Sequence, residues 1–228
     1  MPKLREWVVG ATLTCLWACG GSPEQATIEQ FFMAARTNDT ATVAAISAVS
    51  SPGPVESWQV LEVSSRSTEP FVLPELLVQF EAAEKKREAT LEEGKAYRDD
   101  HEEALGEIIP KLQEDSQFEF RGELGEIQEE WLKLVEERKV KERAFQELKR
   151  AVNDETRLVT RSVVRKVTIE NFDGDVAVTE MLLMLKFKDD GEKPYSITLR
   201  KYDLSASESG QTERSRWIIV DINEKAPT

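Results

Sequence analysis

Few residues of this 228-residue chain have the types and spacing that catalysis or metal binding requires. The only histidine, His101, stands close to Asp99, Asp100 and Glu103, which together could offer metal ligands. On a helix, however, these four side chains point in different directions, and a charged face turned to solvent is the simpler interpretation. Glycine-rich phosphate loops, Ser-His-Asp arrangements and paired Cys/His ligands are missing from the sequence. The sequence therefore predicts no catalytic residue, no metal site and no cofactor.

Cys19 carries the clearest chemical expectation in the chain. It follows a basic N-terminus and the apolar run Trp7–Ala18, whose 12 residues are too few to span a bilayer. The segment Leu16–Cys19 resembles the lipobox of bacterial lipoproteins, in which a leucine and a small residue precede the cysteine that receives the lipid. The resemblance implies that residues 1–18 are a lipoprotein signal peptide and that Cys19 is lipidated. Ordinary secretion with a free Cys19 and an uncleaved anchor are the alternatives.

The lipobox resemblance also implies where the protein is held. A lipid on Cys19 would anchor the chain to a membrane of the cell envelope. In a cell with two membranes, Gly20 stands where an aspartate typically retains lipoproteins in the inner membrane, which favours the outer membrane, facing the periplasm. Cys15 would leave with the signal peptide, so the mature chain would have no pair of thiols for a disulfide.

Residues 74–162 form the most extended pattern, a highly charged segment of helix-forming residues. Apolar residues recur in its second half at heptad spacing, which is typical of the narrow seam of a coiled coil. The seam residues are Leu124, Ile127, Trp131, Leu134, Phe145, Leu148 and Val152. The first half repeats the pattern less regularly, with Arg87, Gly94 and His101 as weak points. We expect a long antiparallel coiled-coil hairpin, which is either a solvated spacer or a surface for dimerisation or partner binding.

The expected pairing of the two helices follows from the position of the turn between them. Polar residues and glycine at 114–122 break the helical pattern, which places the turn near residue 118. Residues equally far from this point should meet, so that Phe145 is predicted to lie opposite Leu91, and Trp131 opposite Leu105. Pro110 should kink the first helix or end it early.

Both flanks of the hairpin show the patterns of a smaller α+β unit. A helix is predicted to start after Ser22 and a second one after Asp39. Alternating apolar residues predict strands at 58–65, 163–171, 176–188, 195–205 and 217–223. Phe172–Asp175 and Asp189–Glu192 are predicted turns. The strand at 176–188 is apolar on both faces near Met181–Leu185, which predicts a place in the middle of a sheet.

The order of these elements is helix, helix, strand, long helical segment and four strands in an antiparallel meander. The helix at 28–35, the Asp39 that follows it and the ending at 216–222 resemble the nuclear transport factor 2-like superfamily, in particular its small bacterial lipoproteins of unknown function. The resemblance implies a cone-shaped, cystatin-like domain made of residues 19–73 and 163–228. In it, a curved antiparallel sheet packs on the N-terminal helices, and the coiled-coil hairpin is inserted after the first strand.

The same resemblance implies where a site inside the cone would lie. Enzymes of this superfamily use a carboxylate there together with a tyrosine or a histidine. Asp221 lies on one face of the last predicted strand, and Tyr195 and Tyr202 are available as its partners. A surface or strand-end acid is the simpler interpretation of Asp221.

Two hypotheses of function follow. The net charge of −13 and the pI near 4.8 argue against nucleic acid and anionic membrane surfaces as direct partners. We favour a lipid-anchored, non-enzymatic interaction or structural module, with a protein partner or a homodimer bound through the hairpin. The alternative is a small-molecule-binding protein or a cryptic enzyme that uses the interior of the cone. An open cavity around Asp221 or a tyrosine favours the alternative, whereas a filled core favours the interaction module.

Overall fold

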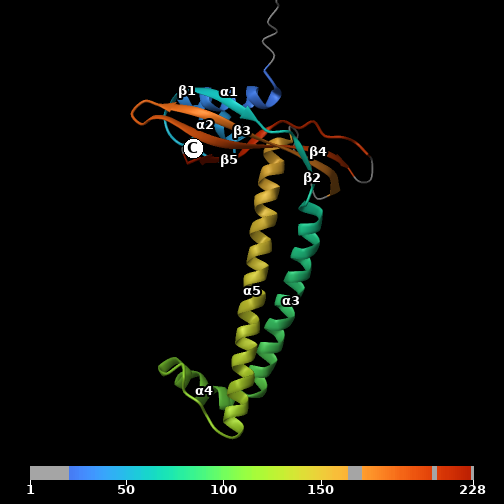
Figure 1. Cartoon of the computed structure of the whole chain (residues 1–228). Helices are drawn as coiled ribbons and strands as arrows, with labels where there is room; N and C mark the ends of the chain where they lie inside the picture. The colour runs from blue at the N-terminus through green and yellow to red at the C-terminus, as the bar shows by residue number, and fades with distance from the viewer. Residues whose placement is uncertain (1–20, 164–170, 207–209, 227–228) are drawn as a thin grey trace, which may run out of the picture.

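The computed structural model describes residues 21–163, 171–206 and 210–226. Within these residues the chain is an α+β protein with five helices and a five-stranded antiparallel open sheet (Figure 1). The helices are α1 (Pro23–Arg36), α2 (Thr40–Ile46), α3 (Leu73–Asp100), α4 (Glu102–Glu114) and α5 (Glu123–Ser162). The strands are β1 (Val55–Val63), β2 (Ser67–Pro70), β3 (Phe172–Phe187), β4 (Gly191–Ala206) and β5 (Ile218–Glu224).

Side chains cap the two N-terminal helices as the sequence predicts. The Ser22 hydroxyl accepts a hydrogen bond of 3.3 Å from the backbone N–H of Gln25, and the Gln25 side chain accepts one of 3.2 Å from the backbone of Ser22. Pro23 occupies the first helical turn. Asp39 accepts a hydrogen bond of 3.0 Å from the backbone N–H of Thr42 at the start of α2. Both predicted helix starts are confirmed.

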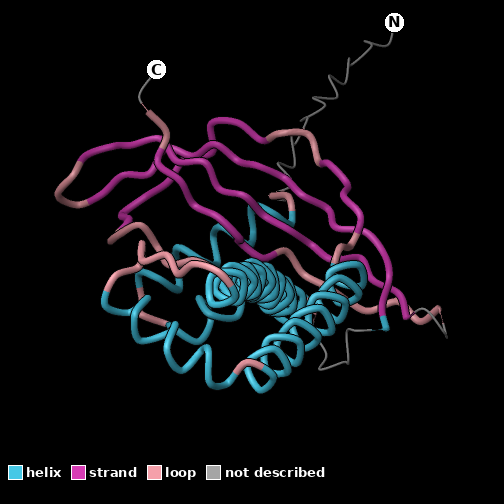
Figure 2. Tube along the Cα trace, turned by 90° about the horizontal axis from the view of Figure 1, so that it is seen from below, coloured by secondary structure: helices cyan, strands magenta, loops and turns pink. Residues whose placement is uncertain are grey.

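β3 is a central strand of the sheet, as its apolar residues on both faces predict. The strand order is β1-β3-β4-β5. β2 extends the same edge as β1, because β1 pairs with residues 181–187 of β3 and β2 pairs with residues 175–178. β3 and β4 pair along their whole lengths. Figure 2, which looks along the long helices from below, shows the strands gathered on one side of these helices.

The sheet buries an apolar cluster on each of its two faces. Side chains alternate along β3, so that Ala177 and Met181 belong to one cluster, while Val176 and Val178 belong to the other. The first cluster packs against α1 and α2 and includes Ile28, Phe31, Phe32, Leu183, Ile197 and Ile219. The second packs against the base of the long helices and includes Phe71, Leu73, Val159, Val163, Tyr202 and Ile218.

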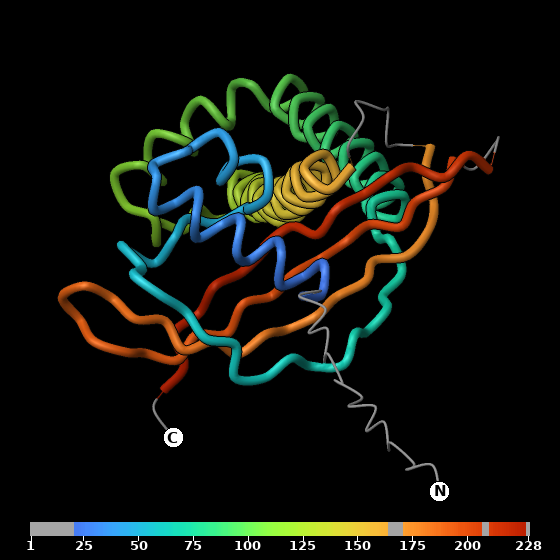
Figure 3. Tube along the Cα trace, turned by 90° about the horizontal axis from the view of Figure 1, so that it is seen from above, coloured from blue at the N-terminus to red at the C-terminus, as the bar shows by residue number. Residues whose placement is uncertain are grey.

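α3 and α5 lie side by side in antiparallel orientation and project away from the sheet (Figure 1). Together with α4 they are called the hairpin below. α5 has 40 residues and is therefore about 60 Å long, which confirms the uninterrupted second helix that the sequence predicts. Seen from above, its C-terminal end lies beside α2 and the sheet (Figure 3). There, Nε of Arg161 donates a hydrogen bond of 3.0 Å to the backbone carbonyl of Ala44.

The predicted turn at Phe172–Asp175 is wrong. These residues begin β3, where Gly174 pairs with Leu204 of β4. Gly174 has a φ of +148°, and a Cβ atom there would lie 2.3 Å from the backbone carbonyl oxygen of Asp203. The glycine therefore permits a close approach of two strands, and the local Asp-Gly-Asp pattern does not distinguish this role from a turn.

One boundary of the hairpin differs from the prediction, and the strand predicted after the hairpin is largely outside the described residues. Ser67–Pro70 forms β2, so the hairpin follows the second strand and not the first. Most of the strand predicted at 163–171 falls on residues 164–170, which lie outside the described residues. Val163 itself follows the end of α5, and its backbone N–H still donates to the carbonyl of Val159 at 2.8 Å.

Candidate functional site

The three residues considered for a site within the α+β unit are not brought together. Tyr195 packs in the cluster against α1 and α2, and its hydroxyl donates a hydrogen bond of 3.2 Å to Glu224. Burial of the hydroxyl raises the pKa of Tyr195, and the hydrogen bond to Glu224 raises it further. Tyr202 is fully buried in the cluster on the opposite face, and Asp221 is partly exposed and accepts a hydrogen bond from Asn223. Both tyrosine rings therefore fill apolar core.

Polar side chains tie the base of α5 to the sheet. Glu155 is buried and lies 3.5 Å from Arg200 of β4, which also forms an ion pair of 2.9 Å with Glu69 of β2. Oε1 of Glu155 and the hydroxyl of Tyr202 are buried without a hydrogen-bond partner among the described residues. Burial of the hydroxyl raises the pKa of Tyr202 far above its usual value, and the charge of Glu155 raises it further. This cluster joins hairpin and sheet.

The ring of Phe145 shows that the predicted register of the two long helices is wrong. It stacks on Phe80, with ring centroids 5.2 Å apart, and not on Leu91. The guanidinium of Arg87 lies 4.5 Å from the centroid of the same ring and 3.8 Å from the carboxylate of Glu142. The helices are antiparallel as expected, but the partner of Phe145 differs by eleven residues, or about three helical turns, from the prediction.

The shift arises because the first helix stops at His101, well before the predicted turn. His101 has φ −121° and ψ 31°, and the next helix, α4, departs from the axis of α3 (Figure 1). Leu105 and Ile108 of α4 are buried, so this helix packs against the long helices without extending α3. Pro110 does not end α4, which continues to Glu114.

Six of the seven predicted seam residues occupy three environments, and the seventh, Trp131, lines a groove between the long helices. Leu134 and Phe145 are buried between the long helices, and Leu148 is half-buried. Val152 packs against the apolar cluster at the base. Leu124 and Ile127 line a recess near the hairpin tip, together with the acidic residues Asp99, Asp100, Glu102, Glu103, Glu107 and Glu123. Within the described residues, no group of three His, Cys, Asp or Glu side chains is placed to hold a metal ion.

A groove runs between α3 and α5 in the part of the hairpin that lies farther from the sheet. Its volume is about 430 Å³. Its α3 wall includes Leu91, Gly94, Lys95 and Arg98, and its α5 wall includes Trp131, Leu134, Val135 and Arg138. Leu134 is buried, Trp131 and Val135 are half-buried, and Leu91 is 38% exposed. We call these eight residues the distal groove. It offers a partly exposed apolar surface that contains an indole ring.

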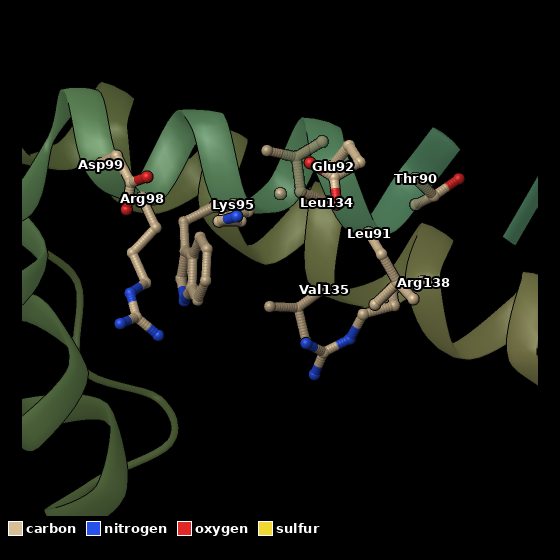
Figure 4. Close-up of a pocket in the computed structure, with 11 residues that line it drawn as sticks. Thr90, Leu91, Glu92, Lys95, Arg98, Asp99, Leu134, Val135 and Arg138 are labelled. Carbon is tan, nitrogen blue, oxygen red and sulfur yellow. The ribbon is translucent and has the colours of Figure 1, made fainter. Parts of the chain in front are cut away.

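Three cations surround the apolar surface of the distal groove. Among the described residues, Lys95, Arg98 and Arg138 form none of the ion pairs found in the structure. Figure 4 shows the guanidinium groups of Arg98 and Arg138 extending to the same side of the groove, away from Glu92 and Asp99. With these two acids included, the groove carries one net positive charge, in a chain whose net charge is −13.

Comparisons with protein-family models, with curated proteins and with solved structures find no significant match. The described helices include none that is both long and apolar enough to cross a membrane. Cys19, the predicted lipidation residue, lies outside the described residues. The fold defines an α+β protein with a projecting helical hairpin.

Sequence reasoning missed the distal groove, although two signals pointed to it. Gly94 interrupts the apolar pattern of α3, and Arg138 occupies a seam position of α5 where an apolar residue is expected. Both residues line the groove. Irregularities of a heptad pattern can therefore mark the place where two helices leave a surface open. The register of the helices was also needed to bring these positions together.

Proposed function

We propose that this protein is a lipid-anchored interaction module of the cell envelope that binds a protein partner through its hairpin and performs no catalysis. In this proposal Cys19 carries the lipid, and the lipobox resemblance of Leu16–Cys19 supports it. The chain would lie at the outer membrane and face the periplasm. The −13 net charge agrees with a protein partner better than with nucleic acid.

We further propose that the α+β unit is a nuclear transport factor 2-like domain and that the hairpin is a coiled-coil insertion in it. The order of the elements supports this assignment, as does the packing of α1 and α2 on one face of the sheet. The second apolar cluster, on the opposite face, would be the addition that accommodates the hairpin. In such a protein the sheet carries the hairpin, and the hairpin makes the contacts.

The observation that carries the proposal is the distal groove. At the base of the hairpin, Leu73 and Val159 are buried. In the groove, formed by the same two helices, Leu134 is buried but Trp131 and Val135 are only half-buried and Leu91 is exposed. A spacer that only holds two objects apart needs no such surface, and exposed apolar patches commonly mark sites of protein contact. The cations beside Trp131 add a basis for selectivity.

The alternative, a small-molecule site within the α+β unit, is less well supported. Tyr195 and Tyr202 lie in different apolar clusters, on opposite faces of the sheet. The hydroxyl of Tyr195 bonds to Glu224, and the carboxylate of Asp221 accepts a hydrogen bond from Asn223. We therefore propose that the two tyrosines stabilise the apolar clusters and do not form a binding site.

The anchor is tested by replacing its acceptor. Cys19→Ser should move the protein from the membrane fraction to the soluble fraction after cell lysis, and mass spectrometry of the wild type should find a lipid on Cys19. A wild-type protein that is already soluble, with an unmodified Cys19, would remove the lipoprotein part of the proposal.

The role of the hairpin is tested separately, with a photo-crosslinking amino acid placed at Val135 in the groove. The matched control places it at Val140, which is 51% exposed on the same helix and does not line the groove. Irradiation of intact cells should give one discrete adduct from position 135 and none from position 140. Equal labelling from both positions would mean that the hairpin is a solvated spacer, and an adduct of two copies of this chain would make it a dimerisation surface.

A further inference from the structure

We infer that the distal groove binds an acidic amphipathic helix of the partner protein, with an apolar side chain of that helix seated beside Trp131 and above Gly94. The inference rests on the function proposed above and adds the chemistry of the partner. Three features of the groove support it: its shape, the glycine in its α3 wall and its charge.

The shape of the groove fits a helix laid parallel to α3 and α5. The two walls of the distal groove span eight residues each, Leu91–Arg98 of α3 and Trp131–Arg138 of α5. At about 1.5 Å per residue, each wall is about 12 Å long, or about two helical turns. A partner helix of this length places two apolar residues, spaced by three or four positions, on one line against the groove. The occupied groove would then resemble the core of a three-helix bundle.

Gly94 provides the space into which such a side chain fits. Apart from its chain neighbours and the backbone of its own helix, no atom lies within 4 Å of a Cβ atom built on Gly94, although this residue lies within α3. Glycine in a helix interior costs about 1 kcal/mol relative to alanine, and packing within the chain does not require it here. The side chains of Trp131 and Leu134 lie across the groove from it and supply apolar contact.

The charge of the groove selects an acidic partner helix. Lys95 and Arg98 lie on one wall and Arg138 lies on the other, so cations flank the apolar surface on both sides. Acidic residues on the two flanks of an amphipathic helix would meet them, while its apolar residues face Trp131. Lysines at the same positions would be repelled. A second copy of this chain that docked groove to groove would be a poor occupant by the same argument, because its own Lys95, Arg98 and Arg138 would meet these cations.

The test uses the full chain in detergent and three labelled peptides of about 15 residues, with binding followed by fluorescence anisotropy. The first peptide has leucines on one helical face and glutamates beside them, the second has lysines in place of the glutamates, and the third contains the residues of the first in scrambled order. The first should bind at least tenfold more tightly than the other two, and its binding should weaken as salt is raised.

Two pairs of variants locate the binding site. Arg138→Glu should weaken binding of the acidic peptide about tenfold or more, whereas Arg143→Glu, an equal charge change on the same helix, should not. Gly94→Leu should fill the groove and abolish binding, whereas Gly106→Leu, at a glycine of α4 with equally open surroundings, should leave it intact. Circular dichroism of each variant checks that the helices are retained.

The outcomes separate this inference from the function on which it rests. Equal binding of the acidic and lysine peptides, or of wild type and Arg138→Glu, would overturn the acidic-helix inference. If crosslinking at Val135 in cells still gives its adduct, the hairpin remains a binding element and only the partner chemistry is wrong. If neither peptide binding nor crosslinking occurs, both the inference and the proposed function fail. Self-association through the groove, lost in Arg138→Glu, would replace the partner helix by a second copy.

Discussion

The two ends of the hairpin are built from the same pair of helices but are buried to different extents. At the base, Leu73 of α3 is 1% exposed and Val159 of α5 is fully buried, because the sheet covers the helices there. In the distal part, Leu91 is 38% exposed and Trp131 is half-buried, because only the two helices cover each other. Burial at the base thus depends on the sheet as well as on the two helices, and in the distal part on a single seam between the helices.

The polar residues of the two ends differ in the same way. At the base, Arg200 joins Glu155 and Glu69 across three elements of the fold. In the distal part, Lys95, Arg98 and Arg138 have no such partners among the described residues. Charges that are paired across elements hold a structure together, whereas unpaired charges around an apolar surface are available to another molecule. The comparison indicates that the base stabilises the fold, and it agrees with the binding role proposed for the distal part.

The largest difference in the free energy of unfolding should appear between truncations of two α3 leucines, one at each end of the hairpin. Leu73→Ala leaves a cavity in the second apolar cluster and should lower the free energy of unfolding by about 2–5 kcal/mol. Leu91→Ala removes a partly exposed side chain and should cost about 1 kcal/mol or less. Urea denaturation followed by circular dichroism measures both. Equal losses would mean that base and distal part are equally tightly packed.

Phe145 lies between the two ends, and its truncation should have an intermediate effect. Phe145→Ala removes the stack on Phe80 and the contact with Arg87, and it should cost about 2 kcal/mol, which is less than in a full core because the seam is two helices thick. A double-mutant cycle with Phe80→Ala should show a coupling of about 0.5–1.5 kcal/mol. A coupling of zero would contradict the register described above, and a cycle of Phe145 with Leu91 is the control.

The response to acid should begin in the α+β unit and not in the hairpin. Burial opposes ionisation of Glu24, but hydrogen bonds from its backbone, Arg66 and Ser22 outweigh it and hold the pKa of Glu24 below 4.5. A carboxylate with a lowered pKa in the folded state stabilises the protein above pH 4.5 and loses this contribution as the pH falls through the lowered pKa. Glu24→Gln should therefore flatten the fall of the melting temperature below pH 4.5.

The hairpin provides the contrast for this experiment. Its ion pairs Lys111–Glu114, Lys133–Glu130 and Lys139–Glu136 are exposed, and exposed pairs contribute little to stability because solvent screens them. Lys139→Gln should leave the pH profile of the melting temperature unchanged. A profile that depends on Lys139 and not on Glu24 would contradict this division.

The smallest effect should be a stabilisation. Gly94→Ala places a methyl group where no atom lies within 4 Å and improves helix propensity, so it should raise the free energy of unfolding by about 0.5–1 kcal/mol. Thermal denaturation detects the change. A destabilised variant would mean that the groove is already filled in solution, by the hairpin itself or by another molecule.

Local patterns of the sequence predicted the elements better than their partners. Ser22 and Asp39 mark helix starts by capping chemistry, which acts within four residues and is therefore visible in the sequence. The partner of Phe145 depends instead on where the first helix stops, and His101 gives only a weak signal of that stop. Gly174 was misassigned because the strand that approaches it, at Asp203, lies 29 residues away.

The candidate site was harder to predict for the same reason. Tyr195 and Tyr202 were considered for it, but side chains alternate along β4 and place the two rings on opposite faces of the sheet. Only the packing shows that both faces of the sheet are covered by apolar clusters. The distal groove combines residues about 40 positions apart, and it forms only in the observed register. Gly94 and Arg138 were visible as irregular positions, but the sequence alone did not show that they share one surface.

The most direct test of the difference between the two ends is a shortened hairpin. Replacing residues 84–141 by a Gly/Ser turn of about six residues keeps the base and the stack of Phe80 on Phe145, and it removes the distal groove. We predict that this variant unfolds cooperatively, within a few degrees of the wild type, and no longer binds the acidic helical peptide. A variant that fails to fold, or one that binds the peptide as tightly as the full chain does, would contradict the account.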